Sequence, residues 1–225
     1  MSAKAADISH NMDSKMIALT FDDGPSEYTD RLLDILSEND AKATFFVTGS
    51  AIDAYSDVVI RAVSQGCEIA GHTWSHRDLT TLTVTEIRQE LQNTNDAIFN
   101  SVGVYPDMFR PSYGAINNNV VSVSEDMNLA IILWTITALD WQSQDADAIY
   151  EMVVDNVRDG VIVLCHDTVE ATIDAMERVI PELVLSGYNL VTVSELLDEK
   201  EAGQLYANSV NGWDGIVHTV QSGDS

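Results

Sequence analysis

The sequence predicts an α/β protein whose parallel strands form a closed or nearly closed barrel. Short apolar runs alternate with segments of helical periodicity along most of the 225 residues, an order typical of repeated β-α units. No dinucleotide-binding glycine fingerprint follows the first apolar run, which disfavours a Rossmann sheet. Polar residues able to do chemistry follow several of the runs, as they do at the mouth of a barrel.

Seven apolar runs have the length and composition of buried strands. They cover residues 16–21, 43–47, 67–70, 107–110, 130–134, 161–165 and 189–193. Helical patterns lie between them over residues 28–39, 51–65, 84–102, 118–126, 145–158 and 172–186. A last helix is expected to begin at Ser194, whose hydroxyl can cap it.

Composition and charge exclude several classes of protein. An apolar content of 45% is typical of a globular chain, and no stretch approaches the roughly 20 apolar residues of a membrane span. A formal charge of −25, from 36 acidic and 11 basic side chains, repels nucleic acid and anionic lipid. This charge is typical of a solvated acidic surface, and it would also tolerate a cationic product.

The two cysteines are predicted to be buried and unpaired. Cys67 and Cys165 both lie in apolar, strand-like runs, which indicates small core residues and no disulfide scaffold. Because Cys165 directly precedes His166 in a strand, the two side chains should point to opposite faces.

Asp22 and Asp23 end the first apolar run and are followed by Gly24 and Pro25. Two adjacent carboxylates are costly unless a cation or a shared proton relieves their repulsion. Neighbouring side chains of a regular strand point to opposite faces, so both can face one site only where the strand breaks. The Gly-Pro pair supplies such a break. The alternative is an exposed Asp-Gly turn.

His72 and His76 are four residues apart, a spacing that can place both imidazoles on one side of a turn. Two imidazoles and one carboxylate from another segment make the three-ligand set of a catalytic zinc site. Either Asp23 or Asp22 can be the third ligand.

Three further segments complete a known series: Phe109-Arg110-Pro111-Ser112-Tyr113-Gly114, Leu139-Asp140-Trp141 and Val161-Ile162-Val163-Leu164-Cys165-His166-Asp167. With the Asp-Asp and His segments, in this order, they resemble the five motifs of the polysaccharide deacetylase family, also called NodB-type or carbohydrate esterase family 4. The fourth motif departs in having Thr137 where the family often has an acidic or amide residue.

The resemblance covers roughly residues 15–197 and implies a distorted (β/α) barrel of about seven parallel strands, similar to a TIM barrel. We therefore expect a catalytic domain over residues 15–200. Residues 1–14 are polar, contain no signal peptide and are interpreted as a linker or expression remnant. Residues 201–225 are interpreted as a C-terminal extension or tail. The resemblance implies an extracellular or cell-surface location.

The resemblance also implies a role for each site residue. Asp23, His72 and His76 would hold one divalent metal ion, with zinc as the first choice and cobalt, nickel or iron as alternatives. Asp22 would be the base that activates water, and His166 the acid that protonates the leaving group. The remaining implied residues are Arg110 beside Asp22, Asp140 beside His166, the backbone N–H of Tyr113 at the oxyanion, and Trp141 and Leu164 around the acetyl methyl group.

Five of these residues have a structural alternative. Trp141 and Leu164 could be ordinary core residues, which is compatible with a place around the acetyl methyl group. Arg110 could lie at the surface beside Pro111, Asp140 could cap the helix that starts near Asp145, and His166 could be a core histidine.

The implied activity is removal of acetyl groups from a carbohydrate polymer. N-acetyl groups of N-acetylglucosamine units in peptidoglycan or chitin come first, and O-acetyl groups of xylan are the ester variant. Two alternatives are kept: a hydrolase of small non-sugar amides on the same fold, and a carbohydrate-binding protein without turnover. The intact pair of Asp22 and His166 disfavours the second.

Overall fold

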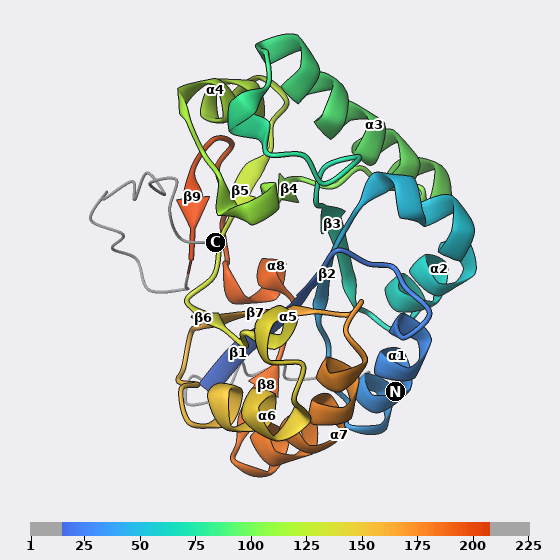
Figure 1. Ribbon diagram of the computed structural model, residues 1–225, viewed down its shortest axis with the longest axis vertical. Helices are drawn as coiled ribbons and strands as arrows, with labels where there is room; N and C mark the ends of the chain where they lie inside the picture. Colours follow the sequence, from blue (N-terminus) through green and yellow to red (C-terminus); the bar gives the residue numbers. More distant parts are fainter. Residues whose placement is uncertain (1–14, 208–225) are drawn as a thin grey trace, which may run out of the picture.

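The computed structural model describes residues 15–207. Its described part contains a curled sheet of nine parallel strands with helices packed around the outside (Figure 1). The strand order is β6-β7-β1-β2-β3-β4-β5-β9, and β8 pairs with β1. This architecture confirms the predicted distorted (β/α) barrel. The strands are β1 (Lys15–Asp22), β2 (Thr44–Val47), β3 (Glu68–Gly71), β4 (Met108–Phe109), β5 (Ala130–Ile132), β6 (Ile136–Thr137), β7 (Ile162–His166), β8 (Tyr188–Leu190) and β9 (Leu205–Tyr206).

Helices lie between successive strands, as expected for β-α units, except between β5 and β6. They are α1 (Thr29–Glu38), η1 (Gly49–Tyr55), α2 (Ser56–Ser64), η2 (Leu79–Thr81), α3 (Val84–Val102), η3 (Ser112–Gly114), α4 (Asn118–Asp126), α5 (Asp140–Ser143), α6 (Ala146–Val154), α7 (Glu170–Leu185) and α8 (Val193–Leu196). The bounds of α3 and α4 are those that the sequence predicts. Both helices have a side-chain N-cap, Thr83 for α3 and Asn117 for α4, and such caps mark a helix start clearly in sequence.

The alternation of side chains along β1 separates two hydrophobic layers. Ile17, Leu19 and Phe21 point outward and pack under the helices, whereas Ala18 points into the barrel. The interior layer also contains small or apolar residues of the other strands, and α8 contributes Val193 and Leu196 to it. Because the period of a strand is two, Thr20 and Asp22 continue the inward-facing row.

The same alternation orders β7. Its register pairs Cys165 with Phe21 and His166 with Asp22. Cys165 lies in the outer layer and is fully buried, so it points away from the side occupied by His166, as predicted. Both cysteines are free and buried.

Five short elements were not predicted from the sequence: η2, η3, β6, α5 and β9. None exceeds four residues, too few for a hydrophobic period to be visible. Strand β9 pairs with β5 through Leu205 and Tyr206, so the segment that was interpreted as an extension from residue 201 onward contributes a strand to the sheet. Residues 208–225, and the proposed linker of residues 1–14, lie outside the described residues.

The prediction that Ser194 caps the last helix is wrong. Thr192 is the N-cap of α8 and forms a capping box with Glu195. The Ser194 hydroxyl instead donates to the carboxyl group of Glu68. Ser and Thr are both good N-caps, and here the Ser194 hydroxyl is engaged by Glu68 of β3.

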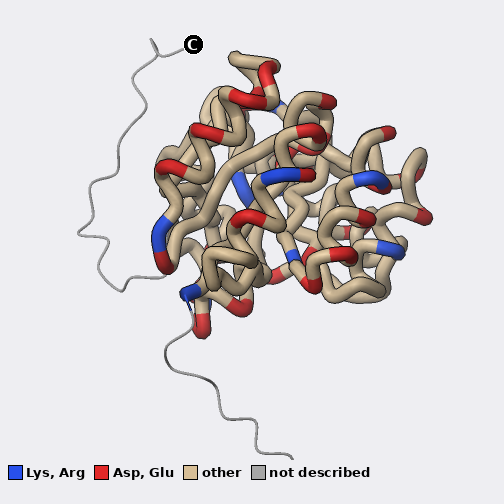
Figure 2. The backbone as a smooth tube through the Cα atoms, turned by 90° about the horizontal axis from the view of Figure 1, so that it is seen from below, with Lys and Arg blue, Asp and Glu red and all other residues tan. Residues whose placement is uncertain are grey.

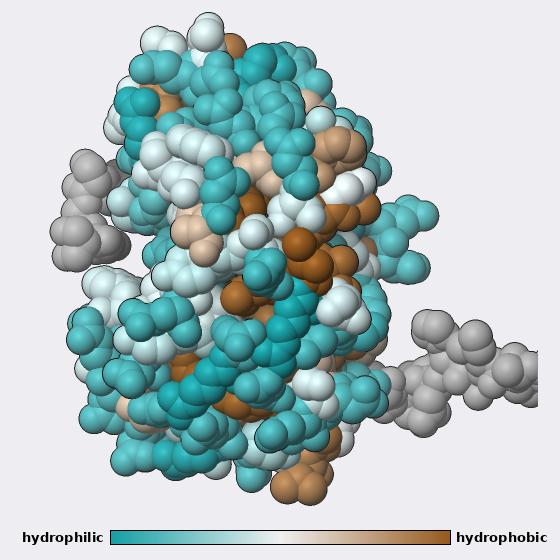
Figure 3. Space-filling view, turned by 90° about the vertical axis from the view of Figure 1, so that its right-hand side faces the viewer, coloured by the Kyte–Doolittle hydropathy of each residue, from teal (hydrophilic) through white to brown (hydrophobic). Residues whose placement is uncertain are grey.

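Acidic residues are distributed over the surface of the described chain, and basic residues are few (Figure 2). Figure 3 shows a face that is largely hydrophilic, with apolar residues gathered near its middle. Within residues 15–207, the helices are too short or too polar to cross a membrane.

Two leucines of α7 test how strongly the outer layer stabilises the fold. Leu183 is 1% exposed and Leu185 is 84% exposed. Leu183→Ala should lower the free energy of unfolding by about 2–5 kcal/mol, because it removes buried methyl groups and leaves a cavity. Leu185→Ala is the matched control and should change it by less than about 0.5 kcal/mol. Urea unfolding measures both, and equal losses would contradict this assignment of the core.

Candidate active site at the carboxyl ends of the strands

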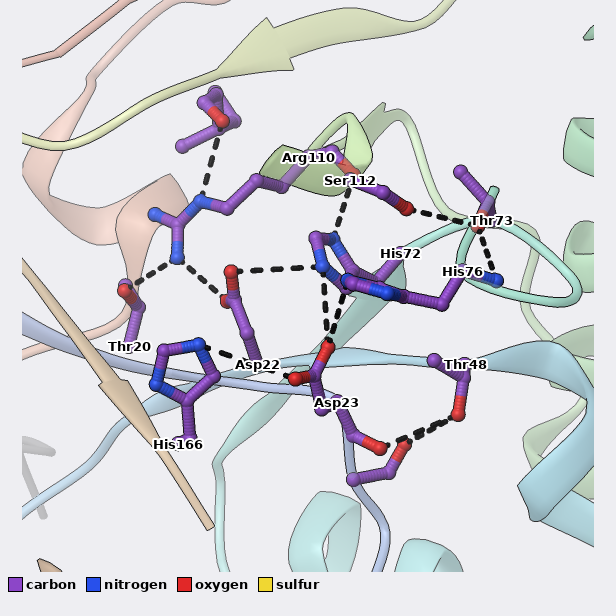
Figure 4. Close-up of polar contacts among 12 residues, drawn as sticks. Thr20, Asp22, Asp23, Thr48, His72, Thr73, His76, Arg110, Ser112 and His166 are labelled. Carbon is purple, nitrogen blue, oxygen red and sulfur yellow. Dashed lines mark hydrogen bonds and ion pairs between the residues drawn. The ribbon is translucent and has the colours of Figure 1, made fainter. Parts of the chain in front are cut away.

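The seven polar residues expected at the site all lie at or just beyond the carboxyl ends of strands, or in the loops that follow. Figure 4 shows His72 and His76 on one side of the two carboxylates and His166 on the other. These residues come from the ends of β1, β3, β4 and β7 and the start of α5: Asp22, Asp23, His72, His76, Arg110, Asp140 and His166. Parallel strands therefore bring together segments that are far apart in the chain.

Asp23, His72 and His76 form a compact donor set. Asp23 Oδ1 lies 3.4 Å from His72 Nε2 and 3.2 Å from His76 Nε2. One ligand atom from each of the three residues lies within 4.8 Å of the other two. Asp23 reaches this position because its backbone has a left-handed φ of 71°, which ends the regular alternation of β1.

The chemistry of this set fits a divalent metal ion. Asp23 Oδ1 is buried and accepts no hydrogen bond in the described structure, which is unfavourable unless a cation is bound. His72 Nδ1 lies 2.8 Å from the carbonyl oxygen of Arg110. This contact places the proton on Nδ1 and leaves the Nε2 lone pair directed at the site, as in metal-binding histidines.

The protonation of these groups reflects their mutual contacts. Burial by itself raises the pKa of Asp23, but the neighbouring imidazoles of His72, His76 and His166 lower it, and the net shift is downward. Burial lowers the pKa of His76, against the opposing effect of Asp23. A carboxylate and neutral imidazoles are the ligand forms that metal binding requires.

Asp22 points into the barrel and is held by Arg110. Arg110 Nη1 donates to Asp22 Oδ1 at 2.7 Å, and the same nitrogen donates to Thr20 Oγ1 at 2.7 Å. The guanidinium also donates to the carbonyl oxygens of Ile132 and Leu133. Arg110 is 0% exposed, so the alternative that placed it at the surface is wrong.

His166 is held by Asp140. His166 Nδ1 lies 2.8 Å from Asp140 Oδ1, while Asp140 Oδ2 accepts from the His166 backbone N–H at 2.6 Å and from the Thr172 hydroxyl at 2.8 Å. Burial by itself lowers the pKa of His166, but the hydrogen bond and charge of Asp140, with smaller effects of Asp22 and Asp23, raise it to about 9. The helix start near Asp145 is capped by Asp145 itself, so Asp140 is not needed there.

The three residues expected to contact the substrate differ in their exposure. Tyr113 is 64% exposed and Trp141 is 53% exposed. The Tyr113 ring lies edge-on to His76, with 4.6 Å between the ring centroids. Leu164 is buried and precedes His166 by two residues in β7, so it shares the inward-facing row.

Sequence reasoning missed two hydroxyl groups that complete these pairs. Thr20 supports Arg110, and its position two residues before Asp22 on the same strand face was a usable signal. Thr172 supports Asp140 from α7, 32 residues away in the chain. No spacing rule links a helical residue to an acceptor at that separation.

Comparisons with known proteins identify similar sequences and a similar fold. The sequence model described as polysaccharide deacetylase matches residues 9–132. The chain is 36% identical to the peptidoglycan-N-acetylglucosamine deacetylase PgdA of Listeria monocytogenes over 91% of its length and 44% of that protein. It is 37% identical to a bifunctional xylanase/deacetylase of Pseudobutyrivibrio xylanivorans over 85% of its length and 32% of that protein.

A third relative has a solved structure. The chain is 38% identical to the peptidoglycan-N-acetylmuramic acid deacetylase PdaC of Bacillus subtilis over 83% of its length and 40% of that protein. The solved structure of PdaC superimposes with a TM-score of 0.80, over 83% of this chain and 91% of that one. The chain thus spans less than half of the length of these three relatives. With a barrel, a set of motifs and relatives of this kind, the chain belongs to the polysaccharide deacetylase family.

Proposed function

We propose that the protein is a metal-dependent hydrolase that removes acetyl groups from a carbohydrate polymer. One observation carries the proposal: the donor set of Asp23, His72 and His76 lies next to Asp22, and His166, held by Asp140, lies on the other side of the two carboxylates. Asp23, His72 and His76 would hold the metal ion, with zinc as the first choice for two imidazoles and a carboxylate. When bound, such an ion lowers the pKa of water and polarises a carbonyl group.

Asp22 is the base in this proposal. Its Oδ1 is occupied by Arg110 at 2.7 Å, whereas its Oδ2 faces the site, 3.8 Å from His72 Nε2. Asp22 Oδ2 is therefore the atom placed to take a proton from the attacking water. Because Arg110 is itself fixed by two backbone carbonyls, the carboxyl group of Asp22 is held in one orientation.

His166 is the acid. Its Nδ1 is held by Asp140, and its Nε2 lies 3.9 Å from Asp23 Oδ2. A pKa of about 9 keeps the imidazole protonated at neutral pH. The Nε2–H can then be delivered to the departing amine or alcohol, which is a poor leaving group without a proton.

The remaining contacts concern the acetyl group and the sugar. The backbone N–H of Tyr113, in a turn with φ of 61°, is the proposed donor to the oxyanion. Trp141 and Leu164 would contact the acetyl methyl group. The exposed rings of Tyr113 and Trp141 are suited to a polymer that lies across the mouth, since aromatic faces pack on apolar faces of sugars.

The proposed substrate is peptidoglycan, with N-acetylglucosamine units first. Its support is that two of the relatives described above are named as peptidoglycan deacetylases. Chitin oligomers and acetylated xylan are the alternatives, the latter because a third relative joins a xylanase to a deacetylase. A cell-wall substrate implies an extracellular or cell-surface location.

Removal of the metal ion should abolish activity. We expect a chelator to stop acetate release from N-acetylglucosamine oligomers, and added zinc or cobalt to restore it. Acetylated xylan and small non-sugar amides, assayed in parallel, separate the substrate alternatives. Stoichiometric zinc without acetate release from any sugar substrate would contradict the proposed reaction and favour a small-amide hydrolase or a binding protein.

Substitutions of the two adjacent carboxylates, Asp22 and Asp23, should have different effects on activity and zinc affinity. Asp22→Asn should lower kcat about 10²–10⁴-fold, because the base is lost, while zinc affinity is retained. Asp23→Asn should lose zinc affinity together with activity, because a charged ligand is lost. Activity assays and equilibrium dialysis with zinc measure both, and loss of zinc by the Asp22 variant instead would reverse the two assignments.

The charge on His166 can be measured in the metal-free protein. We expect its imidazole to titrate at about pH 9, above the usual 6.5, so the proton is held at neutral pH and lost only as the pH rises through 9. Asp140→Asn removes the negative charge and should lower the pKa towards or below 6.5. Asp145→Asn, which alters only the cap of α6, is the control. NMR titration of the imidazole decides, and a parent value near 6.5 would contradict the proposed acid.

A further inference from the structure

The loop that joins the two proposed histidine ligands has an unfavourable backbone. Thr73 and His76 both adopt left-handed conformations, with φ of 64° and 55°. Such a conformation is a genuine outlier for the β-branched Thr73. Conformations of this kind are unfavourable and persist only where the surroundings hold them.

The carboxyl group of Glu90, in α3, binds this loop directly. Its Oε2 accepts from the backbone N–H groups of Trp74 at 3.0 Å and Ser75 at 2.9 Å. Its Oε1 accepts from the Ser75 hydroxyl at 2.8 Å. Among the residues that the structure describes, its side-chain hydrogen bonds therefore go only to two consecutive residues between His72 and His76.

Glu90 is an unusual residue for its place in the helix. It is 8% exposed, and within residues 15–207 no Lys, Arg or His pairs with it in an ion pair. A buried carboxyl group is costly unless its acceptors are satisfied, so packing alone would be better served by an apolar side chain. The polar contacts with the loop are what compensate this cost.

The other side of the loop is fixed by backbone contacts. The N–H groups of Gly49 and Ser50 donate to the carbonyl oxygens of Thr73 and Trp74, at 3.0 and 3.1 Å. A Cβ atom at Gly49 would lie 2.6 Å from the Trp74 ring, so this approach requires a glycine. The backbone N–H groups of η1 thus hold the carbonyl groups of the loop, and the Glu90 carboxyl group holds its amides.

The two histidines depend on this loop to different degrees. The His72 side chain is 3% exposed and is also held by the carbonyl oxygen of Arg110. The His76 side chain is 31% exposed, and its backbone N–H donates to the Thr73 hydroxyl within the loop. Loss of the Glu90 contacts should therefore displace His76 more than His72.

We propose that Glu90 is a positioning residue of the metal site: it holds the loop 73–76 so that His76 faces Asp23 before any metal ion binds. This inference rests on the metal site of the proposed function. Within residues 15–207, Glu90 forms no hydrogen bond or ion pair with Asp23, His72 or His76, and it acts through Trp74 and Ser75. The entropic cost of ordering the loop then arises during folding and does not weaken metal binding.

The experiment measures zinc affinity by competition with a chromophoric chelator, below the unfolding temperature. Glu90→Ala should weaken zinc binding about 10- to 100-fold, the range found when supporting partners of metal ligands are lost. Glu90→Asp, which keeps the charge but shortens the side chain, should weaken it in the same direction and by less. Glu90→Gln, which retains an oxygen for both amides, should bind within about threefold of the parent. Gln89→Ala, at an exposed position of the same helix, is the control and should match the parent.

A second readout is independent of the metal. In the metal-free protein, Glu90→Ala and Glu90→Asp should speed hydrogen exchange at the Trp74 and Ser75 amides, and Gln89→Ala should leave it unchanged.

A third readout uses bound cobalt. With cobalt bound, the Glu90→Ala variant should show an altered visible absorption spectrum, which reports ligand geometry.

Three outcomes would overturn the proposal. The first is that folded Glu90→Ala binds zinc as tightly as the parent. The second applies if the alanine variant does not fold: Glu90→Asp then shows the zinc affinity and the amide exchange rates of the parent. The third is that Gln89→Ala loses as much zinc affinity as Glu90→Ala. A parent that binds no zinc would instead overturn the proposed metal site. The amide exchange rates would still show in that case whether Glu90 holds the loop.

Discussion

A buried ion pair between Arg110 and Asp22 lies inside the barrel next to the donor set, and it fixes the orientation of one of the two adjacent carboxylates. Arg110 is fully enclosed, so its charge needs a partner close by. Asp22 supplies that partner, and Thr20 and two carbonyl groups of the strand β5 region take further N–H groups. Phe46 covers the guanidinium, 4.1 Å from the ring centroid.

The same residue connects the ion pair to the donor set. The carbonyl oxygen of Arg110 lies against His72 Nδ1, and its backbone N–H donates to the carbonyl oxygen of Gly71. The orientation of the His72 ring is thereby fixed by the backbone of Arg110, the residue that follows β4. One side chain and its backbone therefore orient a proposed base and a proposed metal ligand together, and a change at Arg110 would disturb both.

Asp22 and Asp23 differ in environment although they are adjacent. Asp22 continues the inward-facing row of β1, whereas Asp23 follows a break in the strand and turns toward the two imidazoles. The repulsion between the two carboxylates is relieved in two ways. The guanidinium of Arg110 pairs with Asp22, whereas Asp23 faces the imidazoles of a donor set that can hold a cation. This separation allows one carboxyl group to act as a base while the other is a ligand.

The sequence by itself determined the fold class, seven of the strands, and the residues that gather at the site. These features depend on local pattern: hydrophobic runs, helix caps, and polar residues where parallel strands end. The structure was needed for contacts between distant segments, because no periodicity relates Thr172 to Asp140 or Glu90 to the loop at Trp74. Packing of α3 and α7 against the barrel brings those carboxyl groups and their donors together. Elements as short as β6 and β9 were decided in the same way, since two residues carry no pattern and form a strand only where a neighbouring strand offers its edge.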